Sequence, residues 1–279
     1  MTEATLDQNL QRLMGLGRAE ANSASRLQTW IIRIQGALAV LAGATVYVTN
    51  DKLAYLGAIL TLVLAALWAW VSLRFRARRG PSERARRATL LMTSLGTSLS
   101  AHDWRDLFGS FIASAEAGKA LEDPNYYATA AGFGPQRLAE AIEESTFWSA
   151  HLLRKSANVT WFRFGLAFIL ALILLLGSLP FTPAENILGG VRVGCALLVL
   201  FVSTDVIGAA FSYSEAATLL DRLLTRITAV RAANFPLSDV LLILCDYNST
   251  VEGAPMFVPG LYDKHKDSFQ QLWDDTRPS

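Results

Sequence analysis

The chain has 279 residues, of which 52% are hydrophobic and 18% are charged, and its formal net charge at pH 7 is +1. Soluble domains carry about 25% charged residues, so this composition argues against an ordinary cytosolic enzyme. It also excludes a disordered chain, which would combine low hydrophobicity with high net charge. Because the net charge is close to zero, we expect no overall attraction to a nucleic-acid polymer.

Residues that build metal and redox sites are scarce. The chain has two cysteines, which cannot form a disulfide framework, and three histidines without the paired His or Cys spacing of a structural metal site. The sequence contains no Walker A loop, GxSxG, HExxH or CxxC motif. We therefore predict no catalytic residues, no metal site and no cofactor.

Four long apolar segments dominate the sequence: 30–49, 53–73, 164–184 and 188–211. A helix rises about 1.5 Å per residue, so roughly 20 residues cross a hydrocarbon layer about 30 Å thick. Core helices of soluble proteins seldom run this far without charge. We predict two transmembrane helical hairpins, 30–73 and 161–211.

Arginines gather on one side of these hairpins. Seven directly follow the second apolar segment: Arg74, Arg76, Arg78, Arg79, Arg84, Arg86 and Arg87. Further basic residues precede the first and third segments and follow the fourth, whereas the tips carry few. By the positive-inside rule, both tips face outward and both termini are cytoplasmic. We interpret the seven arginines as a topology signal that contacts anionic lipid, with ligand phosphate as the alternative.

Three segments are predicted to lie in the cytoplasm: 1–29, 74–160 and 212–279. The first shows helical apolar spacing, and the second is typical of a helix, a loop over 118–135 and an amphipathic helix over 138–152. The third begins with an apolar helix face over 216–230. We then expect a helix from Ser238, as its cap, to Cys245, although this apolar run is also compatible with a strand. A loop is expected over 246–261. The predicted fold class is an all-α integral membrane protein with two transmembrane hairpins and a mainly helical cytoplasmic part.

The two hairpins share short sequence similarities. Thr29-Trp30 and Thr160-Trp161 each open the first span of a hairpin, and the ATLL runs at 88–91 and 217–220 each lie beyond the second. Duplication of a two-span unit explains this pattern, and chance similarity between two apolar hairpins explains it equally well.

One carboxylate falls inside a predicted span. Asp205 lies about six residues from the inner end of the fourth segment, roughly 9 Å deep. A lone carboxylate at that depth is costly. We expect either an ion pair with Arg33 or Arg163 or a role in lining a water-filled path or gate.

Two aromatic loops are candidates for ligand binding. Tyr126, Tyr127 and Arg137 lie close together in the sequence, and Tyr247 belongs to the second loop. Aromatic faces suit nucleobases and guanidinium groups suit phosphates. The alternative is that these aromatic residues pack the loops onto the helices.

The order of these parts is similar to that of a known family. Gln8-Asn9 precedes the first hairpin, and Tyr126-Tyr127 and the run 144–148 (ESTFW) precede the third span. The tail carries, in order, Asp246-Tyr247-Asn248, Pro255, Pro259, Tyr262 and Leu272-Trp273. With these motifs around four spans, the chain resembles the SMODS-associated four-transmembrane pore-forming effectors of bacterial anti-phage defence. Residues 19–23 depart from the family pattern.

The resemblance implies a homo-oligomer in the bacterial inner membrane. It also implies a partner nucleotidyltransferase that makes a cyclic oligonucleotide, whose binding permeabilises the membrane and arrests the infected cell. Three other interpretations stay open. They are a small constitutive channel or transporter, a non-catalytic scaffold that docks a cytoplasmic partner through 138–152 and 216–230, and a membrane enzyme.

Overall fold

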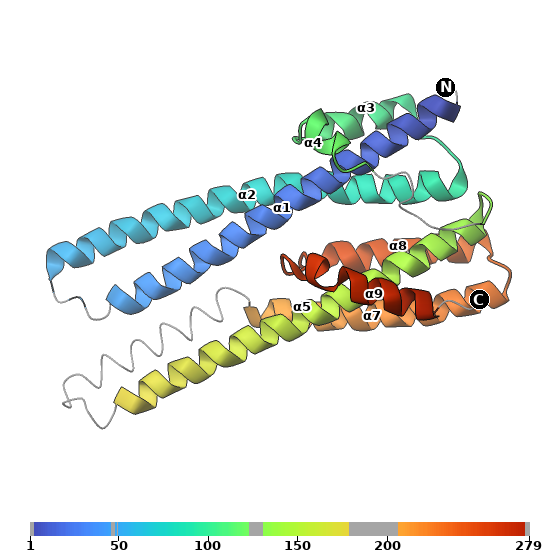
Figure 1. Cartoon of the computed structure of the whole chain (residues 1–279). Helices are drawn as coiled ribbons and strands as arrows, with labels where there is room; N and C mark the ends of the chain where they lie inside the picture. Colours follow the sequence, from blue (N-terminus) through green and yellow to red (C-terminus); the bar gives the residue numbers. More distant parts are fainter. Residues whose placement is uncertain (1–2, 46–47, 49, 123–130, 179–205, 277–279) are drawn as a thin grey trace.

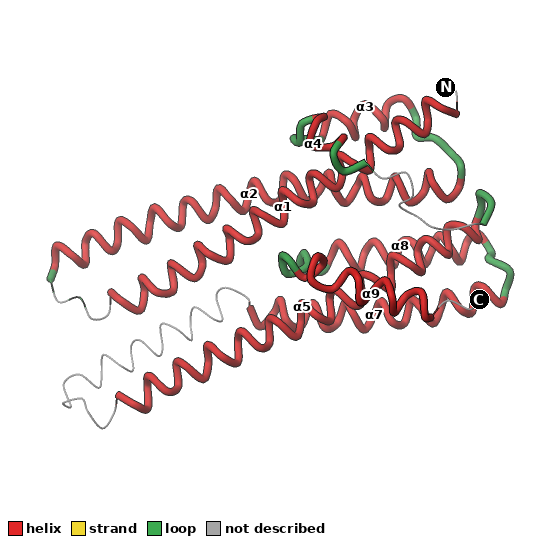
Figure 2. Tube along the Cα trace, viewed as in Figure 1, coloured by secondary structure: helices red, strands yellow, loops and turns green. Residues whose placement is uncertain are grey.

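The computed structural model describes residues 3–45, 48, 50–122, 131–178 and 206–276. In these ranges every regular element is a helix (Figures 1 and 2). In chain order the helices are α1 (Glu3–Thr45), α2 (Asp51–Leu95), α3 (Ala101–Ser110), α4 (Ala115–Lys119), α5 (Pro135–Ser178), α7 (Val206–Ala232), α8 (Leu237–Gly253) and α9 (Leu261–Thr276). The prediction of an all-helical chain is confirmed for this part of the sequence.

The longest helices run through the predicted membrane boundaries without a break. The 43-residue α1 joins the N-terminal segment to the first apolar stretch, and the 45-residue α2 joins the second stretch to the arginine-rich segment. They pack against each other as one hairpin, and α5 packs against α7 (Figure 1). We call the end that contains α3, α4, α8 and α9 the head. The N- and C-terminal ends of the described chain both lie there, far from the α1–α2 tip.

Local capping sets where α2 starts and stops. The Asn50 side chain accepts hydrogen bonds from the backbone N–H groups of Lys52 and Leu53. At the other end Gly96 adopts a left-handed conformation with φ of 66°, and its N–H donates to Met92 O. Ser100 and Ser114 then cap α3 and α4. The single helix predicted ahead of the 118–135 loop is therefore three helices.

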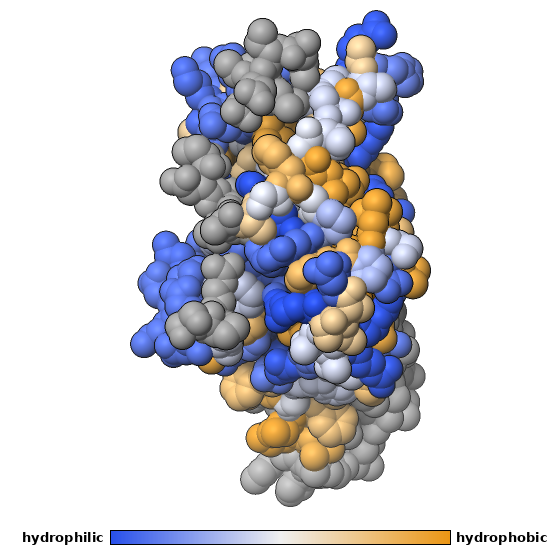
Figure 3. All heavy atoms as spheres, turned by 90° about the vertical axis from the view of Figure 1, so that its right-hand side faces the viewer, coloured by the Kyte–Doolittle hydropathy of each residue, from blue (hydrophilic) through white to orange (hydrophobic). Residues whose placement is uncertain are grey.

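The apolar end of the α1–α2 hairpin is exposed on most sides. Leu53 is 56% exposed, Tyr55 70%, Leu62 72% and, on α1, Val40 73%. Both helices are long and apolar enough to cross a membrane. Soluble proteins rarely expose contiguous apolar patches of more than a few hundred Å². This surface therefore points to membrane association. Figure 3 looks onto the opposite, head end, where hydrophilic residues cover much of the surface.

The head has two hydrophobic cores. The larger one joins α5, α7, α8 and α9, with Leu138, Ile142, Leu220 and Ile227 all 0–1% exposed. The smaller one joins α1, α2 and α3 around Leu13 and Leu107. The amphipathic faces predicted over 138–152 and 216–230 are confirmed, and they pack inside the larger core. They are consequently not available as the docking faces that the scaffold interpretation requires.

The C-terminal segment differs from expectation. The helix α8 begins after Pro236 without a side-chain cap, so Ser238 is not its N-cap, and it continues past Cys245 to Gly253. Val240, Ile243, Leu244 and Tyr247 form one buried face, and this packing extends the helix into the segment predicted as a loop. The connection between α8 and α9 begins only at Ala254.

Candidate functional site

The end of α8 and the connection that follows it are hydrogen-bonded to α1, α2, α5 and α7. We call these residues, 251–258, the junction segment. Gln28 Nε2 on α1 donates to Met256 O at 2.9 Å, and Tyr213 OH on α7 donates to the same carbonyl at 2.6 Å. On α5, Ser156 Oγ accepts from Val258 N at 3.1 Å. Figure 1 shows this connection between the two pairs of long helices.

Arg79 supplies the fourth attachment, from α2. One of its terminal nitrogens donates to Glu252 O at 3.0 Å, to Ala254 O at 2.7 Å and to Val251 O at 3.4 Å. The last four carbonyls of a helix have no partner within the helix and carry its negative dipole end. The guanidinium group of Arg79 donates hydrogen bonds to these carbonyls and places a positive charge at the negative end of the α8 dipole.

Tyr213 is built to remain a hydrogen-bond donor. It is 3% exposed, and burial raises the pKa of its phenol to about 12, although a hydrogen bond with Gln28 and the charges of Arg79 and Arg163 lower it. Below that pH the phenol keeps the proton that it donates to Met256 O. The attachment of the junction segment to α7 is therefore stable across the physiological range.

Most of the arginines after the second apolar segment form ion pairs with protein carboxylates. Five of them form ion pairs: Arg78 with Glu20, Arg79 with Glu83, Arg84 with Asp106, Arg86 with Glu83 and Glu252, and Arg87 with Glu252. These pairs give five of the seven arginines a structural role, and lipid contact stays a prediction for them. Arg74, which lies over the Trp70 ring, and Arg76 are exposed close to the apolar end, and lipid contact stays a prediction for these two as well.

Glu20 is a buried carboxylate that sequence reasoning did not identify. It is 0% exposed, its Oε2 lies 3.0 Å from Arg78 Nη1, and its Oε1 accepts from the backbone N–H groups of Ile112 and Ala113. A buried carboxylate is tolerated when it is paired and fully hydrogen-bonded. Glu20 thereby fixes the connection between α3 and α4 against α1 and α2.

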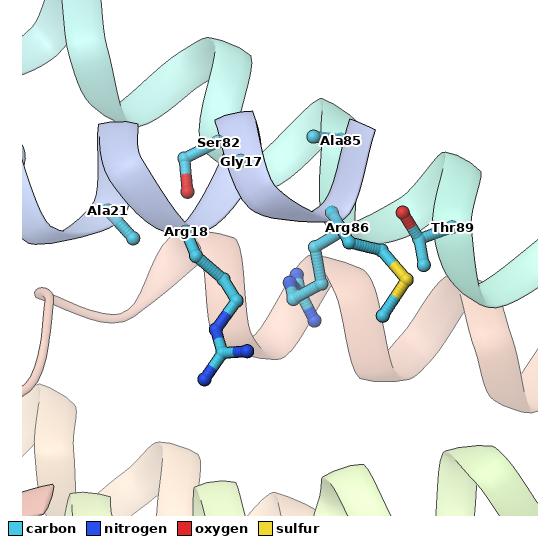
Figure 4. Close-up of a pocket in the computed structure, with 8 residues that line it drawn as sticks. Gly17, Arg18, Ala21, Ser82, Ala85, Arg86 and Thr89 are labelled. Atoms are coloured by element: carbon cyan, nitrogen blue, oxygen red, sulfur yellow. The ribbon is translucent and has the colours of Figure 1, made fainter. Parts of the chain in front are cut away.

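A pocket of about 120 Å³ lies between α1 and α2, within the head. Its lining combines small, apolar and polar side chains: Met14, Gly17, Arg18, Ala21, Ser82, Ala85, Arg86 and Thr89. Figure 4 shows Arg18 and Arg86 extending in the same direction from the two helices. Thr89 is 3% exposed, and its Oγ1 finds no hydrogen-bond partner among the described residues. Guanidinium and hydroxyl donors at one pocket suit a phosphate or carboxylate group.

Arg86 links this pocket to the junction segment. Its guanidinium lies 3.2 Å from the Glu83 carboxylate and 3.4 Å from the Glu252 carboxylate, and it stands over the Tyr247 ring. Arg87 also contacts Glu252, at 3.1 Å. Glu252 lies in the last turn of α8, where a negative charge opposes the helix dipole. An anion in the pocket would compete with Glu252 for Arg86.

The sequence-predicted ligand residues do not converge on one described site. Tyr126 and Tyr127 lie outside the described residues. Arg137 donates to Ala131 O at 3.3 Å and stands 4.9 Å over the Phe133 ring. Tyr247 is 2% exposed, and its OH lies 3.3 Å from Ser149 Oγ. The prediction that Tyr247 lies in an open loop is wrong, because α8 buries it against α5.

The predicted intramembrane pair is described only in part. Asp205 lies outside the described residues, so its pairing stays a prediction. Arg33 is exposed and stands 5.3 Å over the Trp30 ring, and Arg163 is exposed as well. Within the described ranges, no three His, Cys, Asp or Glu residues cluster in a way that could hold a metal ion.

The chain matches no protein-family model, no curated protein and no solved structure.

Proposed function

We propose that the protein is a homo-oligomeric effector of the bacterial inner membrane that permeabilises the membrane when a phosphate-bearing cytoplasmic signal binds its head. The observation that carries this proposal is the continuity of α1 and α2. Each runs unbroken from the exposed apolar hairpin into the pocket lined by Arg18 and Arg86. A helix end that shifts at the pocket moves the membrane end of the same helix.

In this proposal the chain crosses the membrane four times, with both termini in the cytoplasm. The described α1–α2 hairpin provides the first two spans, and α5, which carries no charged residue from 164 to 178, begins the second hairpin. The position of both described chain ends in the head supports this topology. So does the excess of arginine on the head side of the apolar segments.

The volume of the pocket limits which part of the signal molecule can bind inside it. Sites for drug-sized ligands have volumes of about 300–1,000 Å³, whereas this one has about 120 Å³. We therefore propose that the pocket takes no more than one phosphate group, near Arg18, Arg86 and Thr89. A cyclic oligonucleotide would insert one phosphate between α1 and α2 and leave its remaining atoms outside. The resemblance to the anti-phage effectors supports this ligand class and a partner nucleotidyltransferase as its source.

Dye leakage from liposomes that contain the purified protein tests the proposal. We expect leakage with one or a few members of a panel of cyclic di- and trinucleotides. In Arg18→Ala this response should weaken at least about tenfold, because a charged hydrogen bond to phosphate contributes about 1.5–3 kcal/mol. Arg26→Ala, an exposed arginine on the same helix, is the matched control and should respond like the unmodified protein.

Two outcomes would contradict the proposal. Leakage of equal rate with and without every nucleotide would indicate a constitutive channel. Leakage with none of them would exclude gating by this ligand class.

A further inference from the structure

We propose that the junction segment, residues 251–258, is a latch between the two hairpins, and that an anion in the α1–α2 pocket releases it by drawing Arg86 away from Glu252. The trigger in this inference rests on the proposed function. The holding role of the latch does not, because it concerns contacts that exist without ligand.

The first step is the position of the segment. Gln28, Arg79, Ser156 and Tyr213 belong to four different long helices, and each binds the backbone of the same eight residues. Gln28 is two residues from Trp30, at the start of the first apolar segment, and Ser156 is five residues from Trp161. The latch therefore ties the hairpins together where the head meets the membrane.

The second step is the balance of polar groups at the latch. Ser156 is 0% exposed and Tyr213 is 3% exposed, so their bonds form away from water and leave unpaired buried groups when broken. Gln28 Oε1 is buried and has no hydrogen-bond partner among the described residues. The attached state thus leaves one buried acceptor unsatisfied, which lowers the stability of the attached arrangement.

The third step is the route from the pocket. Arg86 lines the pocket and lies 3.4 Å from Glu252, which is itself part of the latch. When an anion binds Arg86, Glu252 loses one of its two arginine partners and keeps only Arg87. Its carboxylate lies in the last turn of α8, where the helix dipole disfavours negative charge. Arg79 donates hydrogen bonds to three backbone carbonyls at the same place, those of Val251, Glu252 and Ala254. Loosening this turn weakens the attachment to α2 first.

The test measures hairpin separation directly. Spin labels are placed on Val40→Cys and Ile169→Cys, two exposed apolar positions, in full-length protein that also carries Cys195→Ser and Cys245→Ser and is reconstituted in liposomes. The latch variant is Tyr213→Phe with Ser156→Ala. The control is Tyr262→Phe with Ser268→Ala, which removes the same two hydroxyl types from exposed positions on α9.

We expect the label-to-label distance distribution to shift in the latch variant and to stay unchanged in the control. Losing two hydrogen bonds corresponds to a shift of about thirtyfold in the latch equilibrium. Glu252→Gln, which leaves the long helices untouched, should shift the distribution in the same direction. If the double variant loses helical content, Glu252→Gln alone still tests the latch.

An unchanged distribution in both Glu252→Gln and a fully helical double variant would overturn the latch. Leakage measured on the same liposomes separates this failure from that of the proposed function. Shifted distances without leakage in any variant or with any nucleotide would support the latch and refute the effector proposal. Ligand-dependent leakage with unshifted distances would refute the latch alone.

Discussion

The two ends of α2 follow different physical rules although they belong to one helix. Between 53 and 73 the apolar side chains are mostly exposed, as a membrane segment requires. Between 85 and 94 most of its apolar residues are buried, and arginines near them bind carboxylates on other helices. Composition alone defines the first end, whereas specific partners define the second. We therefore expect an added charge to be harmful in the first region, and the loss of a specific polar partner to be harmful in the second.

The largest effect is expected at Glu20, in the head. Glu20→Ala removes the acceptor of the Ile112 and Ala113 N–H groups and the partner of Arg78. We expect about 4 kcal/mol of lost stability, because three hydrogen bonds to a buried charged carboxylate are lost and each contributes at least about 1.5 kcal/mol. Detergent-solubilised protein unfolded by urea and followed by circular dichroism measures this. Glu116→Ala, an exposed carboxylate on α4, is the control, and equal stability of the two variants would refute the buried role of Glu20.

A charge in the apolar end should be nearly as costly, but only there. Leu62→Arg places a guanidinium at a 72% exposed position of α2. At the centre of a membrane helix this costs about 2.5–3.5 kcal/mol, so the amount of membrane-inserted protein should fall. Leu272→Arg, at a 41% exposed leucine of α9, should leave insertion unchanged, as surface substitutions usually do. Equal behaviour of the two variants in membrane flotation would contradict the difference between the regions.

An alkaline titration probes the attachment of the junction segment. Burial raises the pKa of Tyr213 to about 12, from 10.0. The unfolded chain therefore loses this proton first, and the stabilisation is complete below pH 10 and is lost as the pH rises through about 12. Two pKa units correspond to about 2.7 kcal/mol. The stability difference between the unmodified protein and Tyr213→Phe should shrink by that order between these pH values, and a constant difference would contradict the burial of the phenol.

The smallest effect is expected for exposed ion pairs of the head. Arg84 and Asp106 are 42% and 54% exposed, and such pairs contribute about 0–1 kcal/mol. Arg84→Ala should shift the unfolding free energy by less than about 1 kcal/mol, and the shift should vanish in high salt. A larger, salt-independent loss would show that α3 depends on this arginine.

Much of the helical framework could be predicted from the sequence. Uncharged runs identify the apolar segments whatever their neighbours, and apolar spacing identified the buried faces over 138–152 and 216–230. Helix ends were harder to predict. The loop expected at 246–261 is partly helix, since Tyr247 packs against Ser149, which is 98 residues away. Such a contact leaves no local signal.

The candidate site could not be predicted for the same reason. The junction segment has no marked composition beyond Pro255, and it is distinguished by the side chains from four helices that hydrogen-bond to its backbone. Arg79 and Ala254 are 175 residues apart, and Gln28 and Met256 are 228 apart. Likewise, seven arginines after an apolar segment suggest lipid contact. Only the folded head shows that five of them form ion pairs, with the carboxylates of Glu20, Glu83, Asp106 and Glu252.

Topology mapping in intact bacteria tests the central contrast most directly. Single cysteines at Asn50, at the tip of the α1–α2 hairpin, and at Arg76, on its head side, are placed in protein carrying Cys195→Ser and Cys245→Ser. A membrane-impermeant maleimide should label Asn50→Cys in intact cells and Arg76→Cys only after the cells are permeabilised. Equal labelling of both positions before permeabilisation, or protection of Asn50→Cys until the cells are opened, would contradict a hairpin that crosses the membrane with its head in the cytoplasm.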